Sequence, residues 1–370
     1  MSKPNVIIIG TGPGGLAAAR HLAGSDLVNV TLVQRGGVAT YLPGILPVLL
    51  GLRPVTAYRH PVEMPQIQVV PGEVTRLETG RILLADGTVL SADAIIAAPG
   101  LVTDAAAIPA GPHSFAVWEL EMAQVARQAV QSLTSGRAAI VITSLPYRCP
   151  PAPYGLSIAL KALFQEQGRA IEVVIVTPEA RPLLSLSPRA SEFLESLVGT
   201  GNVVLQTAFQ LDHAACRDGL LVAMDGKRIP YDVGLFIPPH RRPAFLAELP
   251  GNGPLVQVDA HLRTTLDKTW IVGDVAATPL PRAAGAAEAQ GHTAAQSVLA
   301  ELGLSEPQAP SVPAPNCYVW TSQSSAARIQ LRFPNGLPPA GKPDLILDPP
   351  SSAIFAEALD APNQWMKQVQ

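Results

Sequence analysis

Cys149 stands where a nucleotide-binding fold normally needs glycine. It follows the apolar, strand-like run AAIVITSL (138–145) and precedes the helix-like run LSIALKALFQEQG (156–168). In a βαβ unit this turn is usually glycine-rich, because backbone N–H groups must approach a phosphate at the helix N-terminus. Here the turn is YRCPPAPYG, with three prolines and no glycine before Gly155. Because a helix dipole favours a thiolate at this position, the sequence predicts a reactive cysteine with a lowered pKa.

A glycine pattern near the N-terminus has the spacing of a dinucleotide-binding loop. The strand-like run NVIIIG leads through TGPGG into the helix-like run LAAARHLAG, so Gly10, Gly12 and Gly15 form GxGxxG. These glycines allow a tight turn, the approach of backbone to a pyrophosphate and close helix–strand packing, and Gly14 belongs to the same turn. The strand and helix on either side argue against a simple glycine-rich turn. The next strand ends at Gln34, where an acidic residue usually binds the adenosine ribose, and an amide is a weaker partner for that hydroxyl.

Strands and helices alternate along the rest of the chain. The run ILLADGTVLSADAIIAAPG (82–100) predicts a hairpin with an ADGT turn and then a strand, and 118–133 predicts a helix. The Cys149 segment starts a second βαβ unit that ends in the strand IEVVIVT (171–177). The pattern predicts an α/β fold with two Rossmann-like, doubly wound domains and a small C-terminal α+β domain.

Composition excludes several classes of protein. The net charge of −3 and the 15% of charged residues give no basis for binding nucleic acid or an anionic membrane surface. No uninterrupted apolar run reaches the roughly 18 residues of a transmembrane helix. Three cysteines are too few for a disulfide scaffold, and the seven histidines show no metal-ligand spacing. Because a strand opens the chain, we expect a cytoplasmic protein, or a periplasmic one if a leader has been removed.

A second motif indicates which dinucleotide is bound. The run KTWIVGDVAA places Gly273 and Asp274 at the end of a strand, just before a long alanine-rich helix. It resembles the second FAD motif of the two-dinucleotide-binding-domain flavoproteins, in which that aspartate binds the ribityl or phosphate region. The run DAIIAAPG, which ends at Gly100, resembles the strand and crossover that leave their FAD domain. The resemblance implies bound FAD, with further contacts from Arg35, Thr40, Val74, Ala98, Arg282 and Ala283.

The cysteine motif resembles a narrower family. RCPPAPYG is similar to the CPPGPYE-type motif in the flavoprotein subunit of flavocytochrome c sulfide dehydrogenase, and related sulfide:quinone oxidoreductases carry a cysteine at the same place. VGLFIPPHRRP, LPRAAGAAEAQG, PAPNCYVW and NQWMKQ resemble further segments of that family, so the resemblance covers essentially the whole chain. It implies a redox-active disulfide between Cys149 and Cys317, through which sulfide or a related small sulfur compound passes two electrons to FAD. Two buried, inert cysteines are the alternative.

The resemblance also implies the division into domains. The FAD-binding domain has two parts, 1–105 and 236–308. Residues 106–235 form a degenerate NAD-like domain that carries Cys149, and 309–370 form a C-terminal domain that carries Cys317. No family motif surrounds Cys216, which we interpret as structural, and His240 and His292 are interpreted as hydrogen-bonded surface or core residues.

Two positions depart from the family pattern. Gly155 stands where the sulfide dehydrogenase motif has a glutamate, a natural acid or base for sulfide chemistry. Thr40 stands where that family attaches FAD through a cysteine, and a hydroxyl is a poor partner for such a thioether. We therefore expect non-covalent FAD. With glycine at position 155, either another residue handles the proton, or the sulfur substrate differs, or the activity is low.

Three functions remain open from the sequence. The first is an FAD-dependent sulfide dehydrogenase, and the second is a sulfide:quinone oxidoreductase or an NADH dehydrogenase, the latter disfavoured by the missing second glycine loop. The third is a flavin electron-transfer or scaffold subunit without its own chemistry, which Gly155 keeps open. The tail SSAIFAEALDAPNQWMKQVQ lacks the lysine-rich face of a membrane-surface helix, so we expect it to pack on its own domain. A soluble acceptor such as a c-type cytochrome is then expected, with a quinone as the alternative.

Overall fold

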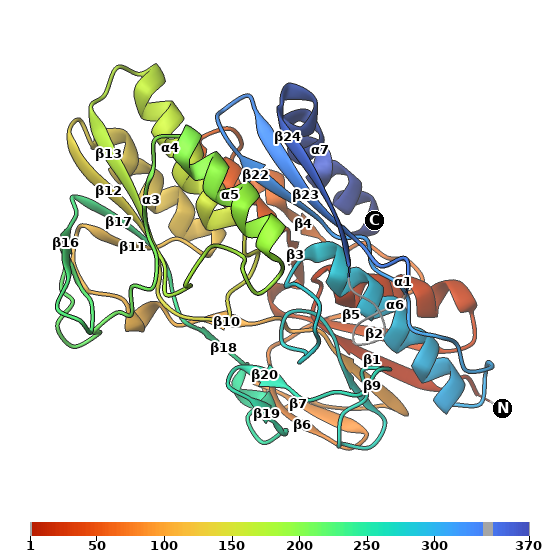
Figure 1. The fold of residues 1–370 in the computed structure, drawn as a ribbon. Coiled ribbons are helices and arrows are strands. Elements are labelled where there is room, and N and C mark those ends of the chain that lie inside the picture. Colours follow the sequence, from red (N-terminus) through yellow and green to blue (C-terminus); the bar gives the residue numbers. More distant parts are fainter. Residues whose placement is uncertain (1, 336–342, 370) are drawn as a thin grey trace.

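The computed structural model describes residues 2–335 and 343–369 and is built around two five-stranded parallel sheets. Figure 1 shows the two sheets side by side, with the C-terminal strands and helix lying along both. The predicted class, two Rossmann-like domains with a C-terminal antiparallel sheet and helix, is confirmed. Among the described residues, no helix combines the length and apolar character needed to cross a membrane.

The first sheet carries the N-terminal glycine loop at the end of its central strand. Its strand order is β21–β9–β1–β2–β5, and all neighbouring pairs are parallel. Helices α1 and α6 pack together on one face, and a small antiparallel sheet, β6–β7–β8, covers the other. The bounds are β1 Asn5–Ile9, α1 Pro13–Ser25, β2 Asn29–Gln34, β5 Gln68–Pro71, β6 Val74–Glu78, β7 Arg81–Leu84, β8 Val89–Ser91, β9 Ala94–Ala97, β21 Thr269–Ile271 and α6 Ala284–Glu301.

The second sheet carries the Cys149 loop. Its strand order is β11–β17–β12–β13–β14, again all parallel. Helices α3, α4 and α5 share a core with one face of this sheet, and the hairpin β15–β16 covers the other face. The bounds are β11 Ser114–Ala116, α3 Leu120–Ser132, β12 Gly136–Ile142, α4 Ala152–Glu166, β13 Ile171–Val176, α5 Pro188–Thr200, β14 Val204–Gln206, β15 Leu220–Val222, β16 Arg228–Pro230 and β17 Val233–Ile237.

The C-terminal unit is an antiparallel sheet with one helix. Strands β22 (Asn316–Trp320), β23 (Ala326–Arg332) and β24 (Asp344–Ser351) pair in that order, and α7 (Ser352–Val369) packs on them. The Phe355 ring of α7 meets the Trp320 ring edge-on, with ring centres 5.1 Å apart. The expected packing of the tail on its own unit is confirmed, and Trp365 also reaches Tyr41 in the first domain, with ring centres 5.3 Å apart.

Short elements connect these units. The chain crosses between the two large sheets twice, and the two crossings pair as an antiparallel ladder of β10 (Val102–Thr103) with β18 (His240–Arg241). The predicted ADGT hairpin is present as the β7–β8 turn. The other short elements are β3 Val38–Thr40, α2 Ile45–Leu50, β4 Arg59–Pro61, β19 Gly251–Asn252, β20 Leu255–Val256 and five single-turn 3₁₀ helices between Arg35 and Leu246.

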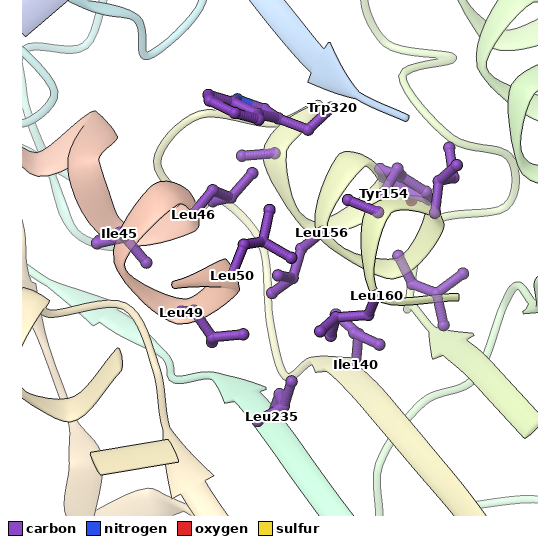
Figure 2. Close-up of a cluster of buried hydrophobic side chains, with 14 of the residues drawn as sticks. Ile45, Leu46, Leu49, Leu50, Ile140, Tyr154, Leu156, Leu160, Leu235 and Trp320 are labelled. Carbon is purple, nitrogen blue, oxygen red and sulfur yellow. The ribbon is translucent and has the colours of Figure 1, made fainter. Parts of the chain in front are cut away.

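One hydrophobic core joins all three units. Figure 2 shows Leu46 and Leu50 of α2 facing Leu156 of α4, with the Trp320 ring of β22 beside them. This packing brings the start of α4 against the backbone of β22. A β-carbon at Gly155 would lie 2.8 Å from the backbone nitrogen of Trp320, closer than real β-carbons approach. Gly155 is therefore a close-contact position, which explains why a glutamate does not stand there.

We predict that Gly155→Ala lowers the free energy of unfolding by roughly 1–3 kcal/mol, because the added methyl overpacks a backbone contact that cannot move freely. Gly199, in the last turn of α5, is the matched control, since a β-carbon there meets nothing within 4 Å. Gly199→Ala is expected to be neutral or stabilising. Urea unfolding of the purified proteins measures both, and equal stability of the Gly155 variant and the unaltered protein would contradict the close-contact assignment.

Candidate functional site

The first glycine loop has the geometry that a pyrophosphate requires. Gly10 has a φ of +97°, and a β-carbon there would collide with the carbonyl oxygen of Ala98. A β-carbon at Gly15 would collide with the carbonyl of Gly10. Gly12 instead faces open space, with nothing within 4 Å of where its β-carbon would be. The loop thus presents free backbone at the helix N-terminus, the arrangement that binds phosphate in dinucleotide folds.

Gln34 does not lie free to meet a ribose. Its Oε1 accepts the Thr11 N–H at 3.2 Å, and its Nε2 donates to the Val38 carbonyl at 3.0 Å. The amide therefore links the glycine loop to β3 by hydrogen bonds, a role that the sequence did not indicate. The neighbouring Arg35 is exposed, and its nearest acidic partner is Glu73, at 3.9 Å.

The second motif lies beside the first sheet, immediately after β21. Gly273 has a φ of +83°, and its N–H donates to Gln290 Oε1 at 2.6 Å. Burial raises the pKa of Asp274, while the Arg148 and Arg282 guanidinium groups oppose that rise. The Arg282 Nε is buried without a hydrogen-bond partner, and burial lowers the pKa of Arg282. An unpartnered guanidinium N–H near Gly273 and Asp274, together with the open backbone at Gly12, fits a bound dinucleotide, so the residues present fit FAD.

The other predicted contacts are spread around these two loops. Ala98 lies against Gly10, and Gly100 follows it with a φ of +68°. Thr40 ends β3, and Ala283 precedes the first residue of α6. Val74 is buried in the core beneath the β6–β7–β8 sheet.

Cys149 is held directly against the second FAD motif. Its N–H donates to the Arg282 carbonyl at 3.0 Å, and its carbonyl accepts the Ala152 N–H at 2.9 Å, at the start of α4. Its φ of +52° lies in the left-handed region, which non-glycine residues adopt at an energetic cost, most often at functional sites. The hydrogen bonds of its N–H and of its carbonyl hold this strained residue on both sides.

The expectation of a lowered thiol pKa is wrong for Cys149. Burial and, next, the Asp274 carboxylate raise its pKa to about 12, against the lowering effects of the Ala152 N–H and the Arg148 charge. A helix dipole acts mainly within the first turn, and Cys149 precedes the first helical residue by three positions. Removal from water outweighs that weak field.

Cys317 lies on β22 and is 8% exposed. Burial and the nearby Cys149 thiol raise its pKa. The structure thus brings the two predicted cysteines together from segments far apart in the chain, beside Asp274 and Arg282. All three cysteines are free thiols in this structure, so the Cys149–Cys317 disulfide stays a prediction. Cys216 lies apart, and its Sγ accepts the Val222 N–H at 3.2 Å, which ties a local loop to β15.

The turn of the second βαβ unit is filled by its own side chains. The Glu179 Oε2 accepts hydrogen bonds from the Tyr154 hydroxyl at 2.5 Å and from the Tyr147 hydroxyl at 3.1 Å. Its Oε1 accepts the Leu183 N–H at 3.1 Å. Glu179 follows β13, the position from which an acidic residue reaches a ribose in a dinucleotide fold. Here both oxygens are occupied within the protein.

Sequence reasoning missed three residues of the site. Arg148, adjacent to Cys149, is buried and ion-paired with Glu119. Glu179 was detectable as an acid just after a strand. Tyr41, whose pKa is raised by burial and by Cys149, carried no sequence signal except its place next to Thr40. Among the described residues, no cluster of three or more His, Cys, Asp or Glu side chains has the arrangement of a metal site.

Comparison with known proteins places this geometry in a family. Residues 4–291 match the family described as pyridine nucleotide-disulphide oxidoreductase. Among solved structures, the sulfide:quinone oxidoreductase of the hyperthermophilic bacterium Aquifex aeolicus has a TM-score of 0.84 at 15% identity, covering 100% of this chain and 91% of that one.

Two other structures show the same fold. NDH2 of Plasmodium falciparum in complex with NADH has a TM-score of 0.72 at 13% identity, covering 97% of this chain and 94% of that one. The NAD-dependent persulfide reductase of A. fulgidus has a TM-score of 0.65 at 19% identity, covering 88% and 64%. Identities this low establish the fold alone. The family match spans most of the chain and agrees with the two glycine loops, so this protein belongs to the pyridine nucleotide-disulphide oxidoreductase family.

Proposed function

We propose that the protein is an FAD-dependent oxidoreductase that oxidises sulfide, or a related small sulfur compound, through Cys149 and Cys317. One observation carries the proposal: the two cysteines lie together, Asp274 of the second motif acts on Cys149, and the Cys149 N–H donates a hydrogen bond to the carbonyl of Arg282, just after that motif. A thiol pair in contact with a flavin motif is the arrangement that passes electrons between sulfur and flavin.

The residues that would hold FAD are the open backbone at Gly12, the turn at Gly273–Asp274 and the unpartnered Nε of Arg282. Thr40 offers no thiol for a covalent link, so the flavin is held non-covalently. FAD, when bound, takes up the two electrons and one proton that hydrosulfide loses as it becomes zero-valent sulfur.

The cysteines carry the sulfur chemistry. Hydrosulfide attacks one sulfur of the Cys149–Cys317 disulfide, a new S–S bond forms and the Cys149–Cys317 bond breaks. The electron pair of the broken bond remains on the released cysteine, and the substrate proton stays on the outer sulfur of the persulfide. Removal from water raises the pKa of both thiols and so disfavours their thiolate forms.

The acceptor follows from the family resemblance. We infer a soluble electron acceptor, by resemblance a c-type cytochrome. The structural likeness to a sulfide:quinone oxidoreductase makes a quinone the alternative acceptor. Steady-state sulfide oxidation with cytochrome c and with a short-chain quinone separates the two.

We predict that the purified protein is yellow and that acid precipitation releases its FAD into the supernatant, because Thr40 cannot form a thioether. Absorbance at the flavin band in supernatant and pellet measures the partition. Flavin retained in the pellet would show a covalent link through another residue.

We predict that excess NADH or NADPH reduces the flavin at least about 100-fold more slowly than sulfide. Prolines in the second turn lack the N–H groups that would bind a phosphate. The Tyr147 and Tyr154 hydroxyls donate hydrogen bonds to the Glu179 carboxylate, which is then not free for a ribose. Stopped-flow mixing monitors bleaching of the flavin. Rapid bleaching by NADH would favour the NADH dehydrogenase interpretation instead.

We predict that Cys149→Ser and Cys317→Ser each slow flavin reduction by sulfide by about 1000-fold or more, because either change removes the disulfide that hydrosulfide attacks. Cys216→Ser is the matched control and should keep the rate within about twofold. Stopped-flow reduction with sulfide measures all three. If the unaltered, FAD-loaded protein is not reduced by sulfide, the alternative of a flavin subunit without its own sulfur chemistry is favoured.

A further inference from the structure

Arg148 ties the Cys149 loop to its surroundings with both its side chain and its backbone. The guanidinium donates to the Trp118 carbonyl at 2.7 Å, to Glu119 Oε1 at 3.1 Å and to the Leu101 carbonyl at 3.4 Å. The Arg148 carbonyl accepts the Trp118 indole N–H at 3.2 Å, and its N–H donates to the His240 Nε2 at 3.4 Å. The residue is 8% exposed.

Two of these partners, Leu101 and His240, come from the two crossings between the large sheets. Leu101 precedes β10, and His240 opens β18, the strand that pairs with β10 through Thr103. The Thr103 hydroxyl also donates to Glu119 Oε1 at 3.0 Å. The Arg148 guanidinium is therefore hydrogen-bonded to the first crossing, at Leu101, and its backbone N–H is hydrogen-bonded to the second, at His240.

His240 can hold its part of this network only as a neutral ring. Its Nδ1 lies 2.9 Å from the Pro238 carbonyl, so Nδ1 carries the proton and Nε2 is left to accept from Arg148. Burial and the nearby Arg148 and Arg282 charges lower the pKa of His240 to about 3. The His240 ring therefore stays neutral near pH 7, and its Nε2 remains able to accept the Arg148 N–H.

We propose that Arg148 is a positioning residue that anchors the Cys149 loop to the β10–β18 crossing ladder and so holds Cys149 in its left-handed conformation against Arg282. The proposal deepens the proposed function, since it names what aligns Cys149 with the flavin motif and with Cys317. Without the anchor, the loop loses the contacts that oppose relaxation of Cys149 to an ordinary backbone conformation.

The test compares Arg148→Met and Arg148→Lys with Arg263→Met in the purified flavoprotein. Arg263 is a matched control, because its ion pair with Glu301, at 3.0 Å, lies away from the cysteines. A lysine keeps the charge of Arg148 but cannot reach the separate acceptors at Leu101, Trp118 and Glu119, so it should not restore the anchor.

The first readout is amide hydrogen exchange by mass spectrometry. Both Arg148 variants should speed exchange at least about 10-fold in peptides covering 145–152, 101–104 and 238–241, while Arg263→Met leaves these peptides unchanged. Unchanged exchange in 145–152, or loss of protection spread evenly over the molecule, would overturn the positioning role. If the Arg148 variants fail to fold, His240→Phe removes the ring nitrogen that accepts the Arg148 backbone N–H. It should speed exchange in the same peptides.

The second readout is flavin reduction by sulfide. We expect a rate at saturating sulfide lowered about 10-fold or more in both Arg148 variants, and wild-type kinetics in Arg263→Met. A wild-type rate of flavin reduction in Arg148→Lys would show that the positive charge at this position is sufficient, and would overturn the role of the hydrogen-bonded anchor. If wild type is not reduced by sulfide but the exchange pattern still appears, the proposed function fails while the positioning role stands.

Discussion

The backbone contact between α4 and β22 at Gly155 is the constraint on which the site depends. Cys149 lies just before α4 and Cys317 lies on β22, so the distance between these elements sets the distance between the thiols. The shared core of α2, α4 and β22 maintains that approach, and only glycine permits it. The absence of a glutamate at this position is thus a consequence of packing.

The close packing of α4 on β22 also buries charged side chains around the cysteines. Arg148, Arg282 and Asp274 act on one another and on Cys149, so that each charge lies near an opposite one. Unpaired, any of them would carry a large desolvation cost. The site therefore places one buried carboxyl near two guanidinium groups, next to Cys149 and close to Cys317.

Local features of this structure could be predicted from the sequence, and features set by distant packing could not. Gly10, Gly12 and Gly15 act within one strand–turn–helix, so their spacing alone indicated their roles. The thiol pKa of Cys149 was predicted in the wrong direction, because its burial depends on strands more than a hundred residues away. Gln34 as a weaker partner for a ribose stays a prediction, while the hydrogen bonds of its amide to Thr11 and Val38 carried no sequence signal. The presence of a glutamine at this position does not reveal whether its amide will bond a ligand or the neighbouring backbone.

The Glu179 network also bears on how such a protein can change over evolutionary time. Two tyrosines of the second turn provide the hydroxyls that satisfy this half-buried carboxylate. A mutation that returned either position toward a glycine loop would leave part of the carboxylate unpaired, a loss of about 1–3 kcal/mol, before any dinucleotide could compensate. Changing either tyrosine alone is thus unfavourable, and several coordinated changes are needed. Epistasis of this kind makes this turn difficult to convert into a glycine-rich, phosphate-binding one.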